Sequence, residues 1–160
     1  APSRGMRAET CRTRVTAQGI GGVGADGARL IIAKPRTFMN ESGGPAAALV
    51  AYHRIPIDRL IVVHDELDLD LGQLRLKCGG GDNGHNGLRS IRKALGSGDF
   101  HRIRMGIGRP PGRQEPADYV LRNFPASQRA DVELEVDRAA GAIQLLIIEG
   151  LAAAQNKYNN

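Results

Sequence analysis

The densest group of residues that could carry chemistry runs from Cys78 to Gly87 and reads Cys-Gly-Gly-Gly-Asp-Asn-Gly-His-Asn-Gly. Such a glycine-rich segment either lets the backbone approach a ligand closely or forms a mobile loop. His85 and Asn86 fall where a helix is predicted to begin, and the backbone N–H groups at a helix start attract anions. The pattern fits a binding role, and it also fits a helix-capping Asn86 with a packing His85.

A group of carboxylates, His64-Asp-Glu-Leu-Asp-Leu-Asp70, follows the apolar run Leu60–Val63. The end of a buried strand in an α/β protein is where ligand-handling groups commonly stand. Asp65 suits a catalytic carboxylate that holds an imidazole in one tautomer and stabilises its charged form. A solvated acidic turn is the alternative. The loop does not fit a calcium site, because Gly72 stands where an oxygen ligand is needed, and we expect no metal.

A third group, Phe38-Met39-Asn40, follows a predicted strand. Two apolar side chains beside an amide suit a small apolar pocket with one orienting polar group. A Phe–Met pair in the core, with Asn40 capping a helix, fits the same letters.

The chain of 160 residues carries 22 Lys and Arg against 17 Asp and Glu, a net charge of +5, and the excess lies in its middle. Residues 71–98 hold five basic side chains and one carboxylate, and residues 99–114 hold four arginines and one carboxylate. Clustered cations suit a polyanion, since they release counterions from phosphates. For Arg102 and Arg104, a phosphate contact and a solvated strand face remain alternatives.

Composition excludes several classes of protein. With 41% hydrophobic residues the chain can close a core, which predicts one domain over residues 1–160. No apolar run approaches the ~20 residues of a membrane-spanning helix. The two cysteines follow no metal or redox spacing, which favours a reduced, cytoplasmic protein. Gly19–Gly24 matches G-x-G-x-x-G, but the Asp26-Gly27 turn leaves no room for the helix that a dinucleotide site needs, so we expect no cofactor.

Strands and helices that would position these residues alternate along the chain. Strands are predicted at 9–18, 29–33, 60–63, 73–77 and 102–107, and helices at 42–53, 86–95, from 116, and from 127 to 149. The first two strands read as a hairpin. This pattern predicts an α/β fold, a single domain with a mixed β-sheet flanked by helices.

Four blocks, in this order and spacing, resemble the bacterial peptidyl-tRNA hydrolase family. They are Lys34-Pro-Arg-Thr-Phe-Met-Asn-Glu-Ser-Gly43, Val63-His-Asp-Glu-Leu-Asp68, Lys77-Cys-Gly-Gly-Gly-Asp-Asn-Gly-His-Asn-Gly-Leu88 and Phe100-His-Arg-Ile-Arg-Met-Gly-Ile-Gly-Arg-Pro110. The similarity extends from about Leu30 to Asn156. It implies a peptidyl-tRNA hydrolase-like fold and an esterase that cuts the bond between a peptide and the terminal ribose of tRNA.

The resemblance also implies roles for individual residues. Asp65 matches the carboxylate that orients a general-base histidine, and Asn40 and Asn86 match the amides that position substrate and water. These three form the implied catalytic set. The implied substrate-binding set is Phe38, Met39, Asn40, His85 and Asn86.

On the tRNA side, Lys77 and Arg104 match the pair that clamps the 5′ phosphate. The implied partner is peptidyl-tRNA, recognised through its acceptor stem and nascent peptide. We expect a cytoplasmic monomer that uses no cofactor and no membrane.

The start of the chain departs from the family pattern. Family members begin with a strand, a Gly-Leu-Gly-Asn-Pro-Gly-like turn and a Thr-Arg-His-Asn motif that carries the catalytic histidine, and residues 1–28 match only weakly. The four histidines, His53, His64, His85 and His101, fall in other segments. We therefore expect an N-terminally truncated chain without the general base, which is worth about 10²–10⁴-fold in rate. The alternative function is a non-hydrolytic RNA-binding relative.

Overall fold

The computed structural model describes residues 7–21 and 27–159. The chain forms two compact units. The first comprises Ala1–Val62 and Cys78–His101, and the second comprises Val63–Lys77 and Arg102–Asn160. Each unit thus combines segments that are distant in the sequence. The division into two units does not test the prediction of a single domain over residues 1–160, which stays a prediction.

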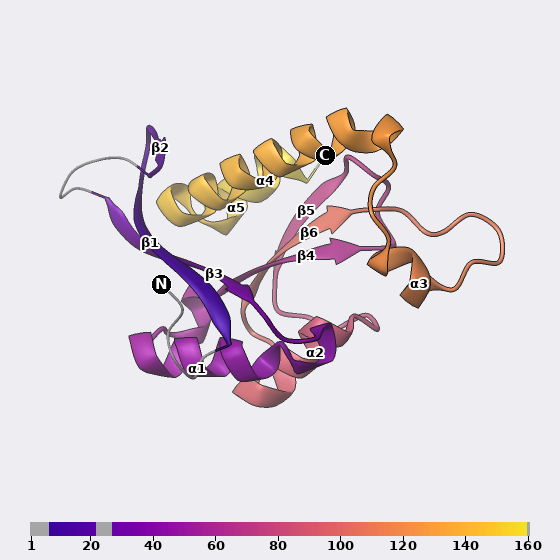
Figure 1. Cartoon of the computed structure of the whole chain (residues 1–160). Coiled ribbons are helices and arrows are strands. Elements are labelled where there is room, and N and C mark those ends of the chain that lie inside the picture. Colours follow the sequence, from indigo (N-terminus) through magenta and orange to yellow (C-terminus); the bar gives the residue numbers. More distant parts are fainter. Residues whose placement is uncertain (1–6, 22–26, 160) are drawn as a thin grey trace. The chain divides into compact units, whose positions relative to one another are not determined.

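The first unit holds an antiparallel hairpin and two helices (Figure 1). Its elements are β1 (Ala8–Thr16), β2 (Gly19–Ile20), β3 (Ala28–Pro35), α1 (Gly43–His53), α2 (Asn86–Leu95) and two 3₁₀ helices, η1 (Met39–Glu41) and η2 (Ile57–Arg59). The predicted hairpin is confirmed, since β1 pairs antiparallel with β3 along its length and the sheet order is β2-β1-β3. The predicted Asp26-Gly27 turn lies partly outside the described residues.

The core of the first unit forms around one face of α2. Leu88 and Ile91, one turn apart, are buried there with Phe100, as the helical spacing of the apolar residues predicts. Partly buried apolar side chains of α1, of η2, of β4 (Ile61–Glu66) and of the residue between η2 and β4 pack against this cluster, namely Ala46, Ile57, Val62 and Leu60. Both helices end at a residue in the left-handed conformation, α1 at Arg54 and α2 at Gly96.

A second sheet has the strand order β4-β6-β5, with β5 (Leu74–Cys78) and β6 (His101–Gly106). Leu74 and Leu76 alternate with exposed or half-exposed residues along β5 and are almost fully buried, as is Ile103 on β6. The mixed α/β class is confirmed, but the described strands form two three-stranded sheets where we expected one mixed sheet. Strand identity follows from local alternation, whereas strand pairing depends on distant contacts.

Helices of the second unit are α3 (Pro116–Leu121), η3 (Ala126–Gln128), α4 (Arg129–Glu149) and α5 (Leu151–Tyr158). The long helix that we expected to begin at Ser127 begins at Arg129, because Ser127 lies inside η3 and Gln128 is the N-cap of α4. We did not predict α5. It begins directly after Gly150, where the chain turns. At its end, the Asn159 side chain bonds to the edge strand β5: it accepts from the Leu76 N–H at 2.7 Å and donates to the Leu76 carbonyl at 3.0 Å.

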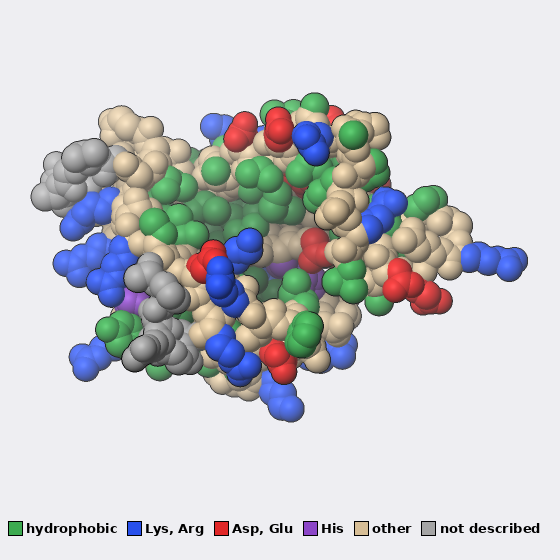
Figure 2. All heavy atoms as spheres, viewed as in Figure 1, with side chains coloured by type: hydrophobic (Ala, Val, Ile, Leu, Met, Phe, Trp, Pro, Cys, Tyr) green, Lys and Arg blue, Asp and Glu red, His purple; other side chains and the backbone are tan. Residues whose placement is uncertain are grey.

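Acidic and basic side chains lie over α4 in the space-filling view (Figure 2). Glu135 differs from them because it is 2% exposed. Burial raises the pKa of its carboxyl, and donation from the Gly72 and Gly106 backbone acts against this.

Among the described residues, no helix is long and apolar enough to cross a bilayer.

Gly106 tests the packing of the second unit. A Cβ at this position would overlap the carbonyl oxygen of Asp70 and lie 2.9 Å from the Leu69 Cβ, whereas a Cβ at Gly44 of α1 would meet nothing within 4 Å. We expect Gly106→Ala to lower the free energy of unfolding by about 1–3 kcal/mol. Gly44→Ala, the control, should leave it unchanged or raise it by up to about 1 kcal/mol. Thermal unfolding followed by circular dichroism measures both, and equal stability of the two variants would contradict this packing.

Candidate functional site

His85 is the N-cap of α2. Its Nδ1 accepts a hydrogen bond from the backbone N–H of Leu88 at 3.1 Å. The capping role that we considered for Asn86 therefore belongs to His85, and Asn86 is the first residue of the helix, with an exposed side chain. The sequence pattern pointed to Asn86 because asparagine is a preferred capping residue and histidine is not.

The cap also sets the tautomer of the His85 ring. A neutral imidazole that accepts a hydrogen bond at Nδ1 carries its proton on Nε2. In this arrangement the Nε2 of His85 can donate to a carbonyl or phosphate oxygen but cannot take a proton from water. His85 therefore suits substrate binding and does not suit the role of general base.

The glycine-rich loop before α2 is held by Asp82. Its Oδ1 accepts from the Gly84 N–H at 3.1 Å, and its Oδ2 lies 3.3 Å from Arg92 Nη1 and 3.8 Å from Arg89 Nε. The Gly84 N–H, followed by the charges of the two arginines, keeps the pKa of the Asp82 carboxyl below its ordinary value. Gly79, Gly80 and Gly84 have positive φ, which only glycine adopts without strain. The contacts of Asp82 and the glycine conformations thus define the path of the loop up to His85.

Phe38, Met39 and Asn40 lie on the surface of the first unit. Phe38 is 80% exposed and Met39 is 55% exposed, so the alternative of a core Phe–Met pair is wrong. Asn40 lies within η1 and caps neither that helix nor α1, whose N-cap is Ser42. An exposed amide beside two exposed apolar side chains remains compatible with a binding surface.

Met39 connects this segment to the start of α2. A Cβ at Gly87 would lie 2.7 Å from Met39 Sδ and 2.9 Å from His85 Cε1, so the Met39 and His85 side chains both pack closely against this glycine. The first unit therefore brings together η1, which carries Met39 and Asn40, and the α2 start, which carries His85 and Asn86.

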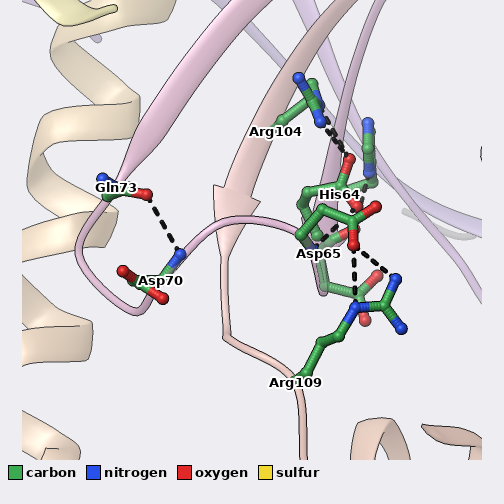
Figure 3. A network of polar contacts seen from close by, with 8 residues as sticks. His64, Asp65, Asp70, Gln73, Arg104 and Arg109 are labelled. Atoms are coloured by element: carbon green, nitrogen blue, oxygen red, sulfur yellow. Dashed lines mark hydrogen bonds and ion pairs between the residues drawn. The ribbon is translucent and has the colours of Figure 1, made fainter. Parts of the chain in front are cut away.

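In the second unit, Asp65 lies near the end of β4, where the sequence placed it (Figure 3). The Nδ1 of His64 lies 2.8 Å from the Asp65 carbonyl oxygen and donates to it. Asp65 is half-buried and lines a cavity of about 170 Å³. The other lining residues come from the end of β6 and from the α3 region: Ile107, Tyr119, Val120, Arg122, Asn123, Phe124 and Gln128. A carboxylate in a mostly apolar cavity fits a site better than a solvated acidic turn.

The α3 side of this cavity was missed by the sequence analysis. The Tyr119 hydroxyl donates to the Ile107 carbonyl at 2.7 Å, and the Arg122 guanidinium lies 4.4 Å from the centre of the Tyr119 ring. The hydrogen bond of Tyr119 holds α3 against the segment after β6, and Arg122 covers the Tyr119 ring. Pro116 marked a helix start in the sequence, but nothing in the letters indicated which segment that helix would face.

Lys77 and Arg104 lie on the neighbouring strands β5 and β6, as the proposed phosphate clamp requires. Arg104 donates through Nε and Nη2 to Glu66 Oε1, at 2.8 and 2.7 Å, in an ion pair whose side chains are 18% and 10% exposed (Figure 3). A guanidinium has five N–H donors, so this pair leaves others to face an anion.

Electrostatics favour an anion at this place. Burial, followed by the positive charges of Arg104 and Arg102, lowers the pKa of the Lys77 ammonium, and Glu66 acts in the opposite direction. A bound phosphate would offset the repulsion among these cations. The sequence analysis did not place Glu66 in the site. Glu66 follows Asp65 directly on β4, so the two side chains face opposite sides of the sheet.

The predicted site residues thus form two groups. Phe38, Met39, Asn40, His85 and Asn86 belong to the first unit, and Asp65, Lys77 and Arg104 belong to the second. Of the residues that the structure describes, no three His, Cys, Asp or Glu side chains are grouped so as to hold a metal ion.

Comparison with known proteins gives matches over nearly the whole chain. A family model described as Peptidyl-tRNA hydrolase matches residues 4–160. The chain is 55% identical over 159 residues to the peptidyl-tRNA hydrolase of Cutibacterium acnes, covering 99% of this chain and 80% of the relative. It is 56% identical over 141 residues to that of Streptomyces coelicolor, covering 88% of this chain and 70% of the relative.

Solved structures agree with these matches. A crystal structure of a mutant peptidyl-tRNA hydrolase from Acinetobacter baumannii superposes with a TM-score of 0.84 at 30% identity, covering 99% of this chain and 76% of that chain. The similarity therefore includes the first 28 residues, which we expected to match only weakly. The expected N-terminal truncation is not borne out by these comparisons, whose matched region begins at residue 4.

The capping contact of His85 predicts which substitutions the helix tolerates. His85→Asn keeps a side-chain acceptor at the N-cap and removes the imidazole, so the free energy of unfolding should change by less than about 0.5 kcal/mol. His85→Ala removes the acceptor and should cost about 1 kcal/mol. Denaturant unfolding of the two variants checks the difference, and the capping account fails if both lose stability equally.

Proposed function

The chain belongs to the peptidyl-tRNA hydrolase family, and we propose that it hydrolyses the ester bond between the peptide and the terminal ribose of peptidyl-tRNA, so that the tRNA is recycled for translation. The observation that carries this proposal is the 55% identity to a curated peptidyl-tRNA hydrolase over 99% of the chain. The exposed amides, the carboxylate beside a cavity and the basic strand pair are the groups that such a reaction needs.

On the peptide side, we assign substrate binding to Phe38, Met39, Asn40, His85 and Asn86. The side-chain amides of Asn40 and Asn86 are exposed and each offers one acceptor and two donor hydrogens, which can orient an ester and a water molecule. Phe38 and Met39 offer apolar contacts to the peptide. The Nε2–H of His85 supplies a donor to a carbonyl oxygen.

Asp65, Asn40 and Asn86 form the proposed catalytic set. Asp65 is the carboxylate that holds a general-base imidazole in one tautomer and stabilises the imidazolium that forms when water is deprotonated. We assign the base to none of the four histidines of the chain. The His85 tautomer excludes that residue, and His53, His64 and His101 fall in other segments than the motif that carries the catalytic histidine of the family.

On the tRNA side, we assign the 5′ phosphate to Lys77 and Arg104. The partly buried ammonium of Lys77 and the guanidinium of Arg104, which Glu66 holds, present two positive groups from adjacent strands. Charged hydrogen bonds to phosphate are strong when the donors are fixed in place. We further propose that the protein acts as a cytoplasmic monomer and uses neither a metal nor a cofactor.

The reaction is tested by measuring release of peptide from peptidyl-tRNA. Because no histidine of the chain is assigned as the base, we expect slow cleavage that imidazole in the buffer accelerates, within the 10²–10⁴-fold that a general base contributes. Asp65→Asn should abolish this acceleration, because it removes the carboxylate that would orient the imidazole. Asp68→Asn is the control, since Asp68 is an exposed partner of Arg109.

Three results would contradict these assignments. Full cleavage without a response to imidazole would show that a residue of the chain is the base. Acceleration that survives Asp65→Asn would remove Asp65 from the catalytic set. Retention of intact peptidyl-tRNA in every condition would overturn the hydrolase function and leave an RNA-binding protein.

Affinity for tRNA with and without a 5′ phosphate tests the clamp. Lys77→Ala leaves the Arg104–Glu66 pair intact, so it should weaken binding of 5′-phosphorylated tRNA by about tenfold and that of dephosphorylated tRNA by much less. The double variant Lys77→Ala, Arg104→Ala should lose more, and the slope of affinity against salt should fall by about one for each lost phosphate contact. Equal losses for both RNAs would contradict the clamp.

A control with the same change of charge is Arg109→Ala combined with Lys157→Ala. Arg109 pairs with Asp68, and Lys157 lies over the Tyr158 ring at 5.5 Å. This variant removes two cations outside the clamp and should affect both RNAs equally.

A further inference from the structure

The N-terminus of α1 is capped by a residue of α2. The first N–H groups of a helix have no partner within it, and a side chain just before the helix usually accepts from one of them. Ser42, the N-cap of α1, accepts no such bond, and its hydroxyl donates to the Met39 carbonyl at 2.8 Å. The N–H of Gly43 donates instead to Ser90 Oγ at 2.8 Å. Ser90 thus supplies a cap to a helix other than its own.

This hydrogen bond lies at a contact between two backbones. A Cβ at Gly43 would overlap the carbonyl oxygen of Ser90 and lie 2.9 Å from the Ala94 Cβ. One turn earlier on α2, a Cβ at Gly87 would lie 2.7 Å from the side-chain sulfur of Met39, so the η1 segment packs on the same helix. Positions 87, 90 and 94 share one face of α2, and this face therefore contacts the α1 start and the η1 segment at successive turns.

Both exposed amides of the proposed catalytic set lie close in sequence to this contact. Asn40 stands three residues before Gly43, and the hydroxyl of Ser42 ties the turn between them to Met39. Asn86 stands one helical turn before Ser90 on α2, which is regular from Asn86 to Leu95. A shift of the α1 start on α2 would therefore move Asn40 relative to Asn86.

We infer that Ser90 is a positioning residue of the active site, which fixes the segment of Met39 and Asn40 against the segment of His85 and Asn86 by capping α1 from α2. The inference rests on the proposed function, since the amides are catalytic only if the chain hydrolyses peptidyl-tRNA. Orientation of reacting groups is a large part of catalysis, and a misplacement of about 1 Å can cost about a hundredfold in rate.

Ser90→Ala removes the acceptor and keeps the close approach of the backbones. The matched control is Ser97→Ala, since Ser97 Oγ accepts from the Asp99 N–H at 3.1 Å in a loop after α2. Both variants lose one hydrogen bond that a backbone N–H donates to a serine oxygen. Ser90→Thr restores the hydroxyl and is the conservative variant.

The rate of peptide release is measured with imidazole present and at a temperature at which all variants are folded. We expect Ser90→Ala to lower kcat about tenfold with KM within twofold, because the phosphate contacts lie on other residues. Ser97→Ala should leave both constants within twofold of the original chain, and Ser90→Thr should recover kcat to within threefold. If Ser90→Ala does not fold, Ser90→Cys replaces it, since a thiol keeps the volume and is a weaker acceptor.

Equal kcat values for Ser90→Ala and Ser97→Ala would overturn the inference, as would a change in KM alone. A second readout does not depend on activity. The side-chain amide resonances of Asn40 and Asn86 should both shift in Ser90→Ala and stay in place in Ser97→Ala. Shifted resonances in a chain that cleaves no substrate would overturn the proposed function and leave the positioning contact standing, whereas unshifted resonances would overturn the positioning itself.

Discussion

The close approach of α1 and α2 is the constraint on which the peptide-side site depends. Gly43 has no room for a side chain against the Ser90 backbone, and the Ser90 hydroxyl accepts from the N–H of the first residue of α1. Ala46, further along α1, packs against the core cluster around α2. The exposed side chains of Asn40 and Asn86 lie on the two segments that this contact joins.

The second unit holds three positive side chains, Lys77, Arg102 and Arg104, close together. Glu66 compensates Arg104 in a nearly buried pair, while Lys77 has no such compensation from its own strand and its pKa is lowered by burial and by the arginines. A nearly buried ion pair contributes little net stability, because desolvation offsets the attraction, but it fixes the direction of the guanidinium. A phosphate placed beside such groups gains from their orientation as well as from their charge.

Local patterns in the sequence predicted much of the fold, and contacts between distant residues account for what was missed. The helix predicted from Asn86 to about Leu95 is confirmed, because Leu88, Ile91 and Leu95 share one face, and the structure ends it at Gly96. The division into two sheets, helix α5 and the late start of α4 were not predicted, since they depend on pairing and on the turns at Pro125 and Gly150. In the site, residue types indicated Asp65, Asn40 and Lys77. Three roles could not be predicted, because each depends on a contact that the letters do not show. Glu66 pairs with Arg104 on another strand, Ser90 caps a helix other than its own, and His85 takes the N-cap position of α2 through one hydrogen bond.

We propose that peptidyl-tRNA binds through its peptide to the exposed amides of Asn40 and Asn86 and through its 5′ phosphate to Lys77 and Arg104. The most direct measurement is a titration of the isotope-labelled chain with a 5′-phosphorylated acceptor minihelix that carries a peptide through a stable amide in place of the ester. We expect the side-chain resonances of Asn40 and Asn86 to shift at the same ligand concentrations as the side-chain resonances of Lys77 and Arg104. Shifts confined to the basic residues, with both asparagine amides unchanged at saturation, would contradict it.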